Sequence, residues 1–188
     1  MGRELGEAGV SVVSGLALGI DSRAHRGNID GKGTTVAVLG SSPDNIYPVS
    51  NRDLARRILD TGGLILSEYP PGTEPLKMNF PARNRIISAM ARGTVIVEAP
   101  EKSGALITAR FALEHGRDIW VDMVGITSRQ GAGTKRLAED GAAVINSADA
   151  ILTDWGLAKA RAGNTRDESL GQGANAASAM AEYLNIKL

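Results

Sequence analysis

The stretch TVIVEAPEKSGALITARFALEHGRDIWV, residues 94–121, decides the fold class. It opens with a short β-branched run (Thr94–Glu98) and continues through a segment with apolar residues at helical spacing (Gly104–His115). Gly116 follows, where a glycine commonly ends a helix, and a second apolar run (Asp118–Val121) closes the stretch. The order strand, helix, strand is typical of a βαβ unit, whose two strands are parallel.

The rest of the chain repeats this alternation. Its other apolar runs are continuous rather than alternating, as expected of parallel strands that are buried on both faces. The runs that we predict to be strands are Val10–Val13, Thr35–Leu39, Leu64–Ser67 and Ala143–Ile145. We therefore predict an α/β fold of the Rossmann-like, doubly wound type, with a mostly parallel sheet flanked by helices.

Two further helices have recognisable ends. Ser50 can cap a helix that contains Leu54 and Ile58 and that Gly62 ends. Pro81 suits the first turn of another helix, which closes at Gly93.

The length and composition divide the chain into a core and a tail. Its 188 residues, of which 43% are hydrophobic, suffice for one domain with a buried core. Small and polar residues dominate the segment AKARAGNTRDESLGQGANAASA near the end. We expect a core over residues 1–153 and a flexible tail over residues 154–188.

Charge and cysteine content bound the compartment and the partners. The chain contains no cysteine, which excludes disulfides and thiolate metal sites and suits a cytoplasmic protein. No apolar run approaches the roughly 18 residues that cross a bilayer, so we expect no membrane partner. Lys plus Arg (21) balance Asp plus Glu (21), so any signal for nucleic acid must be local.

The first candidate site is SGLALGID, residues 14–21. Ser14 and Gly15 end a predicted strand, and Gly15 and Gly19 let the backbone turn sharply and present N–H groups to an anion. A close-packed turn between a strand and a helix explains the same glycines.

The second candidate site is PLKMNFPARNRII, residues 75–87. No acidic residue lies between Glu74 and Glu98. Arg83 and Arg85 fall in the first turn of the predicted helix, where the macrodipole disfavours cations unless a phosphate lies there. Lys77 and Phe80 add a cation and an aromatic face, which single-stranded nucleic acids use for backbone and base contacts. In the alternative interpretation Phe80 is a core residue and the arginines form a solvated face.

The third candidate site is KSGALITAR, residues 102–110. Ser103 and Gly104 lie where a loop becomes a helix and offer free N–H groups beside Lys102. A simple N-cap explains Ser103 nearly as well.

The sequence evidence for a catalytic site is weaker than that for the three candidate binding segments. Asp21 and His25 lie four residues apart on a predicted helix and could form a triad with Ser14, although a structural histidine is far more common. Glu68 and Glu98 each close a strand and could form an acid/base pair, or could anchor Arg83 or Arg85. We identify no catalytic residue, no metal-ligand spacing and no cofactor motif.

Five stretches, in this order, resemble the DNA-processing protein A (DprA/Smf) family from Gly9 to about Leu152. They are SGLALGIDSRAH, AVLGSSPDNIYP, LILSEYPPGTEP, FPARNRIISAMARGTVIVEA and KSGALITARFALEHGRDIW. The resemblance implies a homodimer that binds single-stranded DNA, loads the RecA recombinase and acts in natural transformation without a catalytic step. It places DNA contacts at Lys77, Phe80, the run Arg83-Asn84-Arg85, and Ser103-Gly104.

The chain also departs from the family pattern. The resemblance implies that a first strand, central in the family's sheet, is missing and leaves two neighbours unpaired. The dimer-forming region reads Met123-Val124-Gly125 where the family has Val-Pro-Gly. A third hypothesis is that the chain is a non-functional remnant of a truncated gene, which should unfold in a broad, weakly cooperative transition.

The alternative function is that of a nucleotide-binding enzyme. LOG-type phosphoribohydrolases share the Rossmann-like fold and carry a PGGxGTxxE loop. APEKSGALITA, residues 99–109, stands in its place without the loop glycines and glutamate, which argues against hydrolysis.

Overall fold

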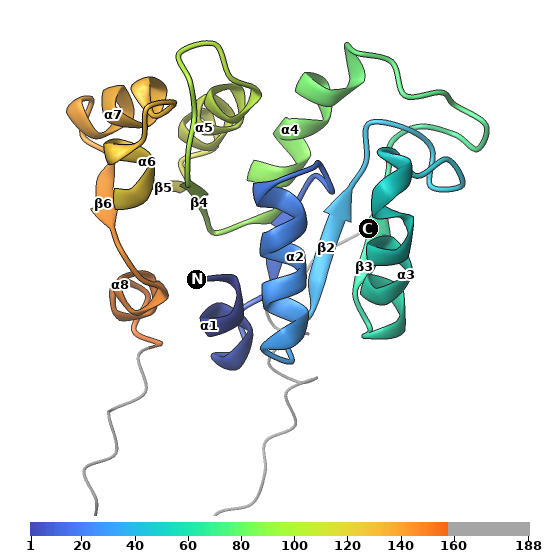
Figure 1. The fold of residues 1–188 in the computed structure, drawn as a ribbon, viewed down its shortest axis with the longest axis horizontal. Coiled ribbons are helices and arrows are strands. Elements are labelled where there is room, and N and C mark those ends of the chain that lie inside the picture. Colours follow the sequence, from blue (N-terminus) through green and yellow to red (C-terminus); the bar gives the residue numbers. More distant parts are fainter. Residues whose placement is uncertain (158–188) are drawn as a thin grey trace, which may run out of the picture. The chain divides into compact units, whose positions relative to one another are not determined.

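The computed structural model describes residues 1–157 and shows two parallel sheets flanked by helices (Figure 1). In the first sheet β2 lies between β1 and β3, and the pairs Val13–Val36 and Ala37–Ile65 set the register. In the second sheet β5 lies between β4 and β6. The strands are β1 (Val12–Ser14), β2 (Thr35–Val38), β3 (Leu64–Leu66), β4 (Gly93–Ile96), β5 (Asp118–Asp122) and β6 (Ala143–Ile145).

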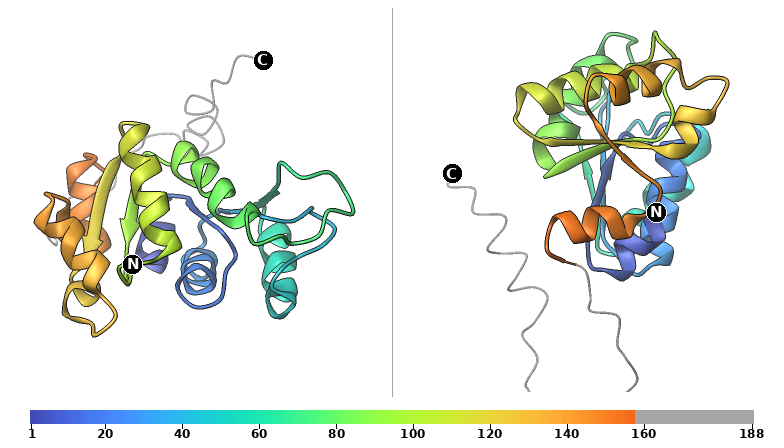
Figure 2. Two further views of the ribbon diagram at one scale, coloured as in Figure 1. Left: turned by 90° about the horizontal axis from the view of Figure 1, so that it is seen from above. Right: turned by 90° about the vertical axis from the view of Figure 1, so that its left-hand side faces the viewer.

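The helices connect and cover these strands. α8 returns past β6 to lie beside α1 (Figure 2), where the Ala148 amide donates to Glu4. The helices are α1 (Gly2–Glu7), α2 (Ile20–Asp30), the 3₁₀ turn η1 (Val49–Asn51), α3 (Arg52–Asp60), α4 (Asn79–Met90), α5 (Gly104–Glu114), α6 (Met123–Thr127), α7 (Ala132–Glu139) and α8 (Ala148–Asp154).

The α/β class and the parallel strands are confirmed, but the strands form two sheets rather than one. Across Figure 1 the strands follow the order β6, β5, β4, β2 and β3. Within residues 1–157, β1 and β4 each pair with a strand on one side only. α4 links the two parts, because it contacts β1 and β2 as well as α5.

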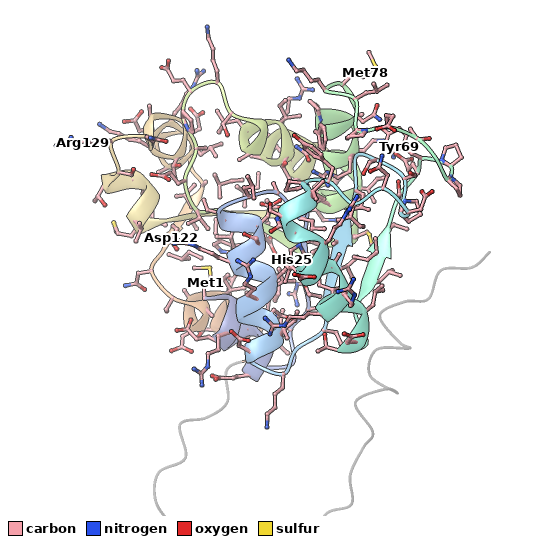
Figure 3. All side chains as sticks on the ribbon, turned by 45° about the vertical axis from the view of Figure 1, so that its right-hand side comes forward. Met1, His25, Tyr69, Met78, Asp122 and Arg129 are labelled. Atoms are coloured by element: carbon pink, nitrogen blue, oxygen red, sulfur yellow. The ribbon has the colours of Figure 1, made fainter. Side chains whose placement is uncertain are left out.

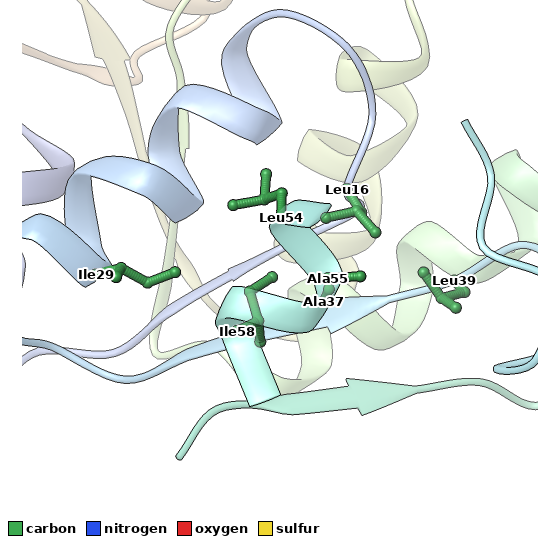
Figure 4. Packing of buried hydrophobic residues seen from close by; sticks show 7 residues of the cluster. All are labelled: Leu16, Ile29, Ala37, Leu39, Leu54, Ala55 and Ile58. Carbon is green, nitrogen blue, oxygen red and sulfur yellow. The ribbon is translucent and has the colours of Figure 1, made fainter. Parts of the chain in front are cut away.

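Each sheet has its own apolar core. Figure 4 shows the core of the first sheet, where α3 contributes Leu54, Ala55 and Ile58. The other members of this cluster are Leu16, Ile29, Ala37 and Leu39. Around the second sheet the buried residues form two further clusters, which are Ile96, Ala99, Ala109 and Val121, and Trp120, Ile145 and Ile151.

The six predicted strands are confirmed to within two residues at each end, but two helix starts differ. A 3₁₀ turn holds Ser50, so α3 begins after Asn51 and Ser50 does not cap it. α4 begins at Asn79, which puts Pro81 in the first turn and moves Arg83 and Arg85 one turn further in. The prediction that the helix macrodipole disfavours these two arginines is therefore wrong, since the effect is confined to the first turn.

The boundary predicted at residue 153 stays a prediction; α8, the last helix of the described residues, ends at Asp154. The tail predicted for residues 154–188 lies almost entirely outside the described residues. None of the helices in the described part of the chain is long and apolar enough to cross a membrane.

Candidate nucleic-acid interface

The loops that follow β1, β2, β3 and β4 gather along one side of the molecule, at the top of Figure 1. This side carries the carboxyl ends of the parallel strands, where ligands of open α/β sheets bind. All three candidate segments of the sequence lie there.

Arg83 is a structural residue at the base of this side. Its side chain is 5% exposed, and its guanidinium donates hydrogen bonds to the carbonyl oxygens of Gly15 and Val38. Burial lowers the pKa of this guanidinium, and the charge of Asp21 offsets part of that effect. A side chain at Gly15 would collide with Arg83, since an added Cβ would lie 2.5 Å from its Nη2 atom. Arg83 thus ties α4 to the ends of β1 and β2.

The carboxylate of Asp21, in the first turn of α2, closes the loop after β1. Asp21 accepts hydrogen bonds from the Gly15 and Ala17 amides at 3.0 and 3.2 Å. Leu16 adopts a φ of 58°, and its carbonyl accepts a 2.8 Å bond from Asn51. The Gly15 amide, expected to face a phosphate, is therefore occupied by Asp21.

The loops after β2 and β3 clasp one another. The Ser42 hydroxyl donates to the carbonyl of Thr73 at 3.1 Å, and Asp44 accepts from the Gly72 amide at 3.1 Å. The neighbouring Ser42 hydroxyl and the hydrogen bond from the Gly72 amide lower the pKa of the Asp44 carboxyl. The clasp therefore fixes the position of the segment that leads to Lys77.

Lys77 and Phe80 lie at the rim, next to the start of α4. Lys77 is exposed and makes no ion pair among the described residues. Phe80 is half-buried and packs over Gly40, where an added Cβ would come within 2.8 Å of the ring. Figure 3 shows Met78 and Tyr69 on the same rim, with Met78 pointing outward.

Tyr47 belongs to this rim, although the sequence analysis did not identify it. Its ring centroid lies 5.7 Å from that of Phe80, and the rings are tilted by 49°. The family-like stretch AVLGSSPDNIYP contained this residue, but no pattern in it placed Tyr47 beside Phe80.

Asn84 and Arg85 connect α4 to neighbouring elements. The Asn84 side chain donates to the Gly104 carbonyl at 3.2 Å, which joins α4 to the start of α5. Arg85 forms an ion pair with Glu68, as one interpretation of the sequence predicted. Both side chains reach solvent, so they remain accessible to a ligand.

Ser103 and Gly104 form the second wall of the site. The Ser103 hydroxyl oxygen accepts a 3.2 Å bond from the Ala105 amide, so Ser103 is an N-cap of α5. An added Cβ at Gly104 would meet no atom within 4 Å, so its surroundings are open. An open hollow lies beside this helix start, lined by Pro81, Glu101, Lys102, Ser103, Gly104, Leu106, Ile107 and Arg110.

The possible triad is not assembled. His25 is fully buried, and its Nδ1 lies 2.7 Å from the Thr35 hydroxyl, which itself donates to the Val12 carbonyl. This chain of bonds assigns the Nδ1–H tautomer and leaves Nε2 buried without a partner. Burial lowers the pKa of His25 to about 4, so the ring is neutral at physiological pH. Asp21 meanwhile serves the Gly15 loop.

The two strand-terminal glutamates have separate partners. Glu68 pairs with Arg85, and Glu98 accepts a hydrogen bond from Ser128. Among residues 1–157, no three His, Asp or Glu side chains are grouped as a metal site would require.

These features define a Rossmann-like α/β domain with a cationic and aromatic site at the carboxyl ends of its strands. The sequence profile of the family described as DNA recombination-mediator protein A matches residues 1–156, and the chain belongs to this family.

Relatives and solved structures agree with this assignment. The chain is 46% identical over 150 residues to Protein Smf of Synechocystis sp., covering 80% of this chain and 37% of that protein. It is 41% identical over 144 residues to the DNA processing protein DprA of Streptococcus pneumoniae, covering 77% of this chain and 51% of that protein. The chain thus spans about half, or less, of the length of these relatives.

Solved structures of two relatives share the fold. The X-ray structure of DprA from Streptococcus pneumoniae superposes with a TM-score of 0.71 at 39% identity, covering 81% of this chain and 56% of that one. DNA processing protein A from Helicobacter pylori, described for its single-stranded DNA binding mode, superposes with a TM-score of 0.69 at 31% identity. That match covers 82% of this chain and 69% of the other.

Proposed function

We propose that this domain binds single-stranded DNA and serves DNA processing in recombination. The observation that carries the proposal is the rim formed by exposed Lys77 and half-buried Phe80 opposite the helix start at Ser103 and Gly104. Lysine contacts phosphates and an aromatic ring stacks on bases, which together suit a single strand without a demand for sequence. The single-stranded DNA binding of the Helicobacter pylori relative supports the same ligand.

The interface divides into contact residues and supporting residues. Lys77, Phe80, Asn84, Arg85 and the Ser103-Gly104 pair reach the surface and supply the contacts. Arg83 and Gly15 hold these contacts in place from behind, since the Arg83 guanidinium and the Gly15 amide already have partners, and Ser14 ends β1 directly before Gly15.

The role that we propose is mediation rather than catalysis, exercised as a cytoplasmic homodimer that loads RecA on incoming DNA during natural transformation. Membership of the recombination-mediator family supports it. The arrangement of the acidic and histidine side chains also supports it, because His25, Glu68 and Glu98 are each engaged in structural contacts.

Fluorescence anisotropy with a labelled single-stranded oligonucleotide at two salt concentrations tests the proposal. We expect Lys77→Ala and Phe80→Ala each to weaken binding by about 1–3 kcal/mol, and only the lysine change to flatten the salt dependence. Arg57→Ala is the matched control, because Arg57 lies in the last turn of α3, at the opposite end of the sheet, in an exposed pair with Asp30.

Duplex DNA and AMP serve as competitors. Neither should displace the single strand if the site is the proposed one. Displacement by AMP would instead indicate a small-nucleotide site, and unchanged affinity in both variants would remove this rim from the interface.

A further inference from the structure

Tyr47 presents the open aromatic surface of this rim. Its side chain is 48% exposed, whereas Phe80 is half-buried between Gly40 on one side and Tyr47 on another. Part of the Phe80 ring is therefore covered, and the ring with the more open surface at this rim is that of Tyr47.

The backbone around Tyr47 is fixed at several points. The Ser41 hydroxyl donates to the Asn45 carbonyl at 2.7 Å, two residues before Tyr47. The Asn45 side chain donates to Glu74 at 3.2 Å, and Asn51, four residues after Tyr47, is buried and bonded to the Leu16 carbonyl. The exposed ring is thus positioned by its loop and by Phe80, so that ordering it on a ligand costs little entropy.

We infer that Tyr47 is the residue on which an unpaired nucleobase stacks, with Phe80 supporting it from behind. The inference rests on the proposed function and assigns the base contact within that site. Lys77, three residues before Phe80, supplies the cation for the adjoining phosphate. A ring beside a cation is the combination that binds single strands by stacking and backbone attraction.

A base contact at Tyr47 would also give the site a preference for single strands. In a duplex the faces of the bases are covered by their neighbours, so a protein ring cannot stack on them without unstacking a step, which costs a few kcal/mol. Phosphate contacts through Lys77 are available on both forms. Discrimination between the two forms therefore depends on Tyr47.

Tyr47→Leu and Tyr47→Phe test this inference with two probes, labelled oligothymidylate and an abasic oligonucleotide of equal length. We expect Tyr47→Leu to weaken binding of oligothymidylate about tenfold, and Tyr47→Phe to bind within about twofold of the unaltered protein. On the abasic probe all three proteins should bind equally, since no base is present to stack. Val49→Ala is the matched control, because Val49 is 59% exposed two residues further along the same rim and has no ring.

The outcomes separate this inference from the proposed function. If the unaltered protein binds oligothymidylate and Tyr47→Leu binds it equally well, the stacking role is wrong while the interface stands. Equal losses on the thymidylate and abasic probes would also overturn the stacking role. If the unaltered protein binds neither probe, the proposed function itself fails. Leucine keeps an apolar contact for Phe80, and circular dichroism confirms that each variant is folded.

Discussion

The two sheets pair their strands in the same parallel way, but different interactions hold the loops at their carboxyl ends. In the first sheet, buried polar side chains bond to loop carbonyls, as Asn51 does to Leu16 and Arg83 does to Gly15. In the second sheet a neutral hydroxyl holds the loop after β4, since the Ala99 amide donates to the buried Thr134 side chain at 2.8 Å. This bond lies beside an apolar core formed by Ile96, Ala99, Ala109 and Val121.

The two kinds of interaction do different work: apolar packing stabilises the fold, and hydrogen bonds fix the positions of loops. Apolar packing stabilises without direction, whereas a hydrogen bond fixes the position of the group that it reaches. The loops of the first sheet carry Tyr47 and lead to Lys77, and such bonds fix them. Changes to polar residues there should disturb both folding and binding, while changes in the core of the second sheet should affect folding alone.

Replacement of the buried guanidinium should have the largest effect. Arg83→Met removes three hydrogen bonds from a charged donor, of which the two to buried carbonyls are each worth about 1.5–3 kcal/mol, so we expect a loss of about 4 kcal/mol in the free energy of unfolding. Urea denaturation measures it. Arg85→Met is the control on the same helix, and we expect it to cost at most about 1 kcal/mol because its ion pair with Glu68 is exposed.

Equal stability of these two variants would contradict the importance of buried polar contacts in the first sheet. If Arg83→Met does not fold, Arg83→Lys, which keeps a charged donor, should fall between it and the unaltered protein.

Acid should weaken the first sheet through His25. The unfolded histidine takes up a proton near its ordinary pKa of 6.5, while the folded one resists until about pH 4. The unfolded state therefore binds more protons in this window, and stability falls as the pH drops from 6.5 towards 4. The full effect corresponds to about 3 kcal/mol.

Unfolding free energies across this pH range, for the unaltered protein and for His25→Asn, isolate the contribution of His25. Asparagine keeps a donor for the Thr35 hydroxyl but does not titrate. Identical pH slopes for the two proteins would show that His25 is not the buried neutral group described here.

The smallest effect should come from the core beneath the second sheet. Ile151 is 2% exposed in the cluster with Trp120 and Ile145. Ile151→Val should lower the free energy of unfolding by about 1 kcal/mol and leave the affinity for single-stranded DNA unchanged. A change in affinity at equal folded fraction would show that the second sheet also positions the interface.

Much of the fold could be predicted from the sequence because its signals are local. The run Thr94–Glu98 and the helix from Gly104 were read from apolar spacing and a glycine stop, and both are confirmed within a few residues. Ser50 shows the limit of such signals, since a 3₁₀ turn takes the place of the expected cap. The interruption between the two sheets was implied only by the family resemblance, which leaves two strands unpaired, because strand pairing depends on contacts between distant segments.

The sequence brought the residues of the candidate site together in a few segments, but it did not tell which of them are buried supports and which are exposed. Sequence placed Lys77, Phe80 and Arg83 in one basic and aromatic segment, but composition does not tell a solvated arginine from a buried one. Arg83 is buried because the carbonyls of Gly15 and Val38, far from it in sequence, converge on it. The pairing of Tyr47 with Phe80 has the same non-local origin.

Two adjacent residues of α4 reach in different directions, since Arg83 bonds to the ends of β1 and β2 while Asn84 bonds to the start of α5. One rigid helix therefore sets the spacing between the rim at Phe80 and the wall at Gly104. On the proposed function, a strand of DNA would meet this spacing already formed. Its capture should follow single-exponential kinetics, at a rate proportional to DNA concentration, with salt acting mainly on the rate of encounter.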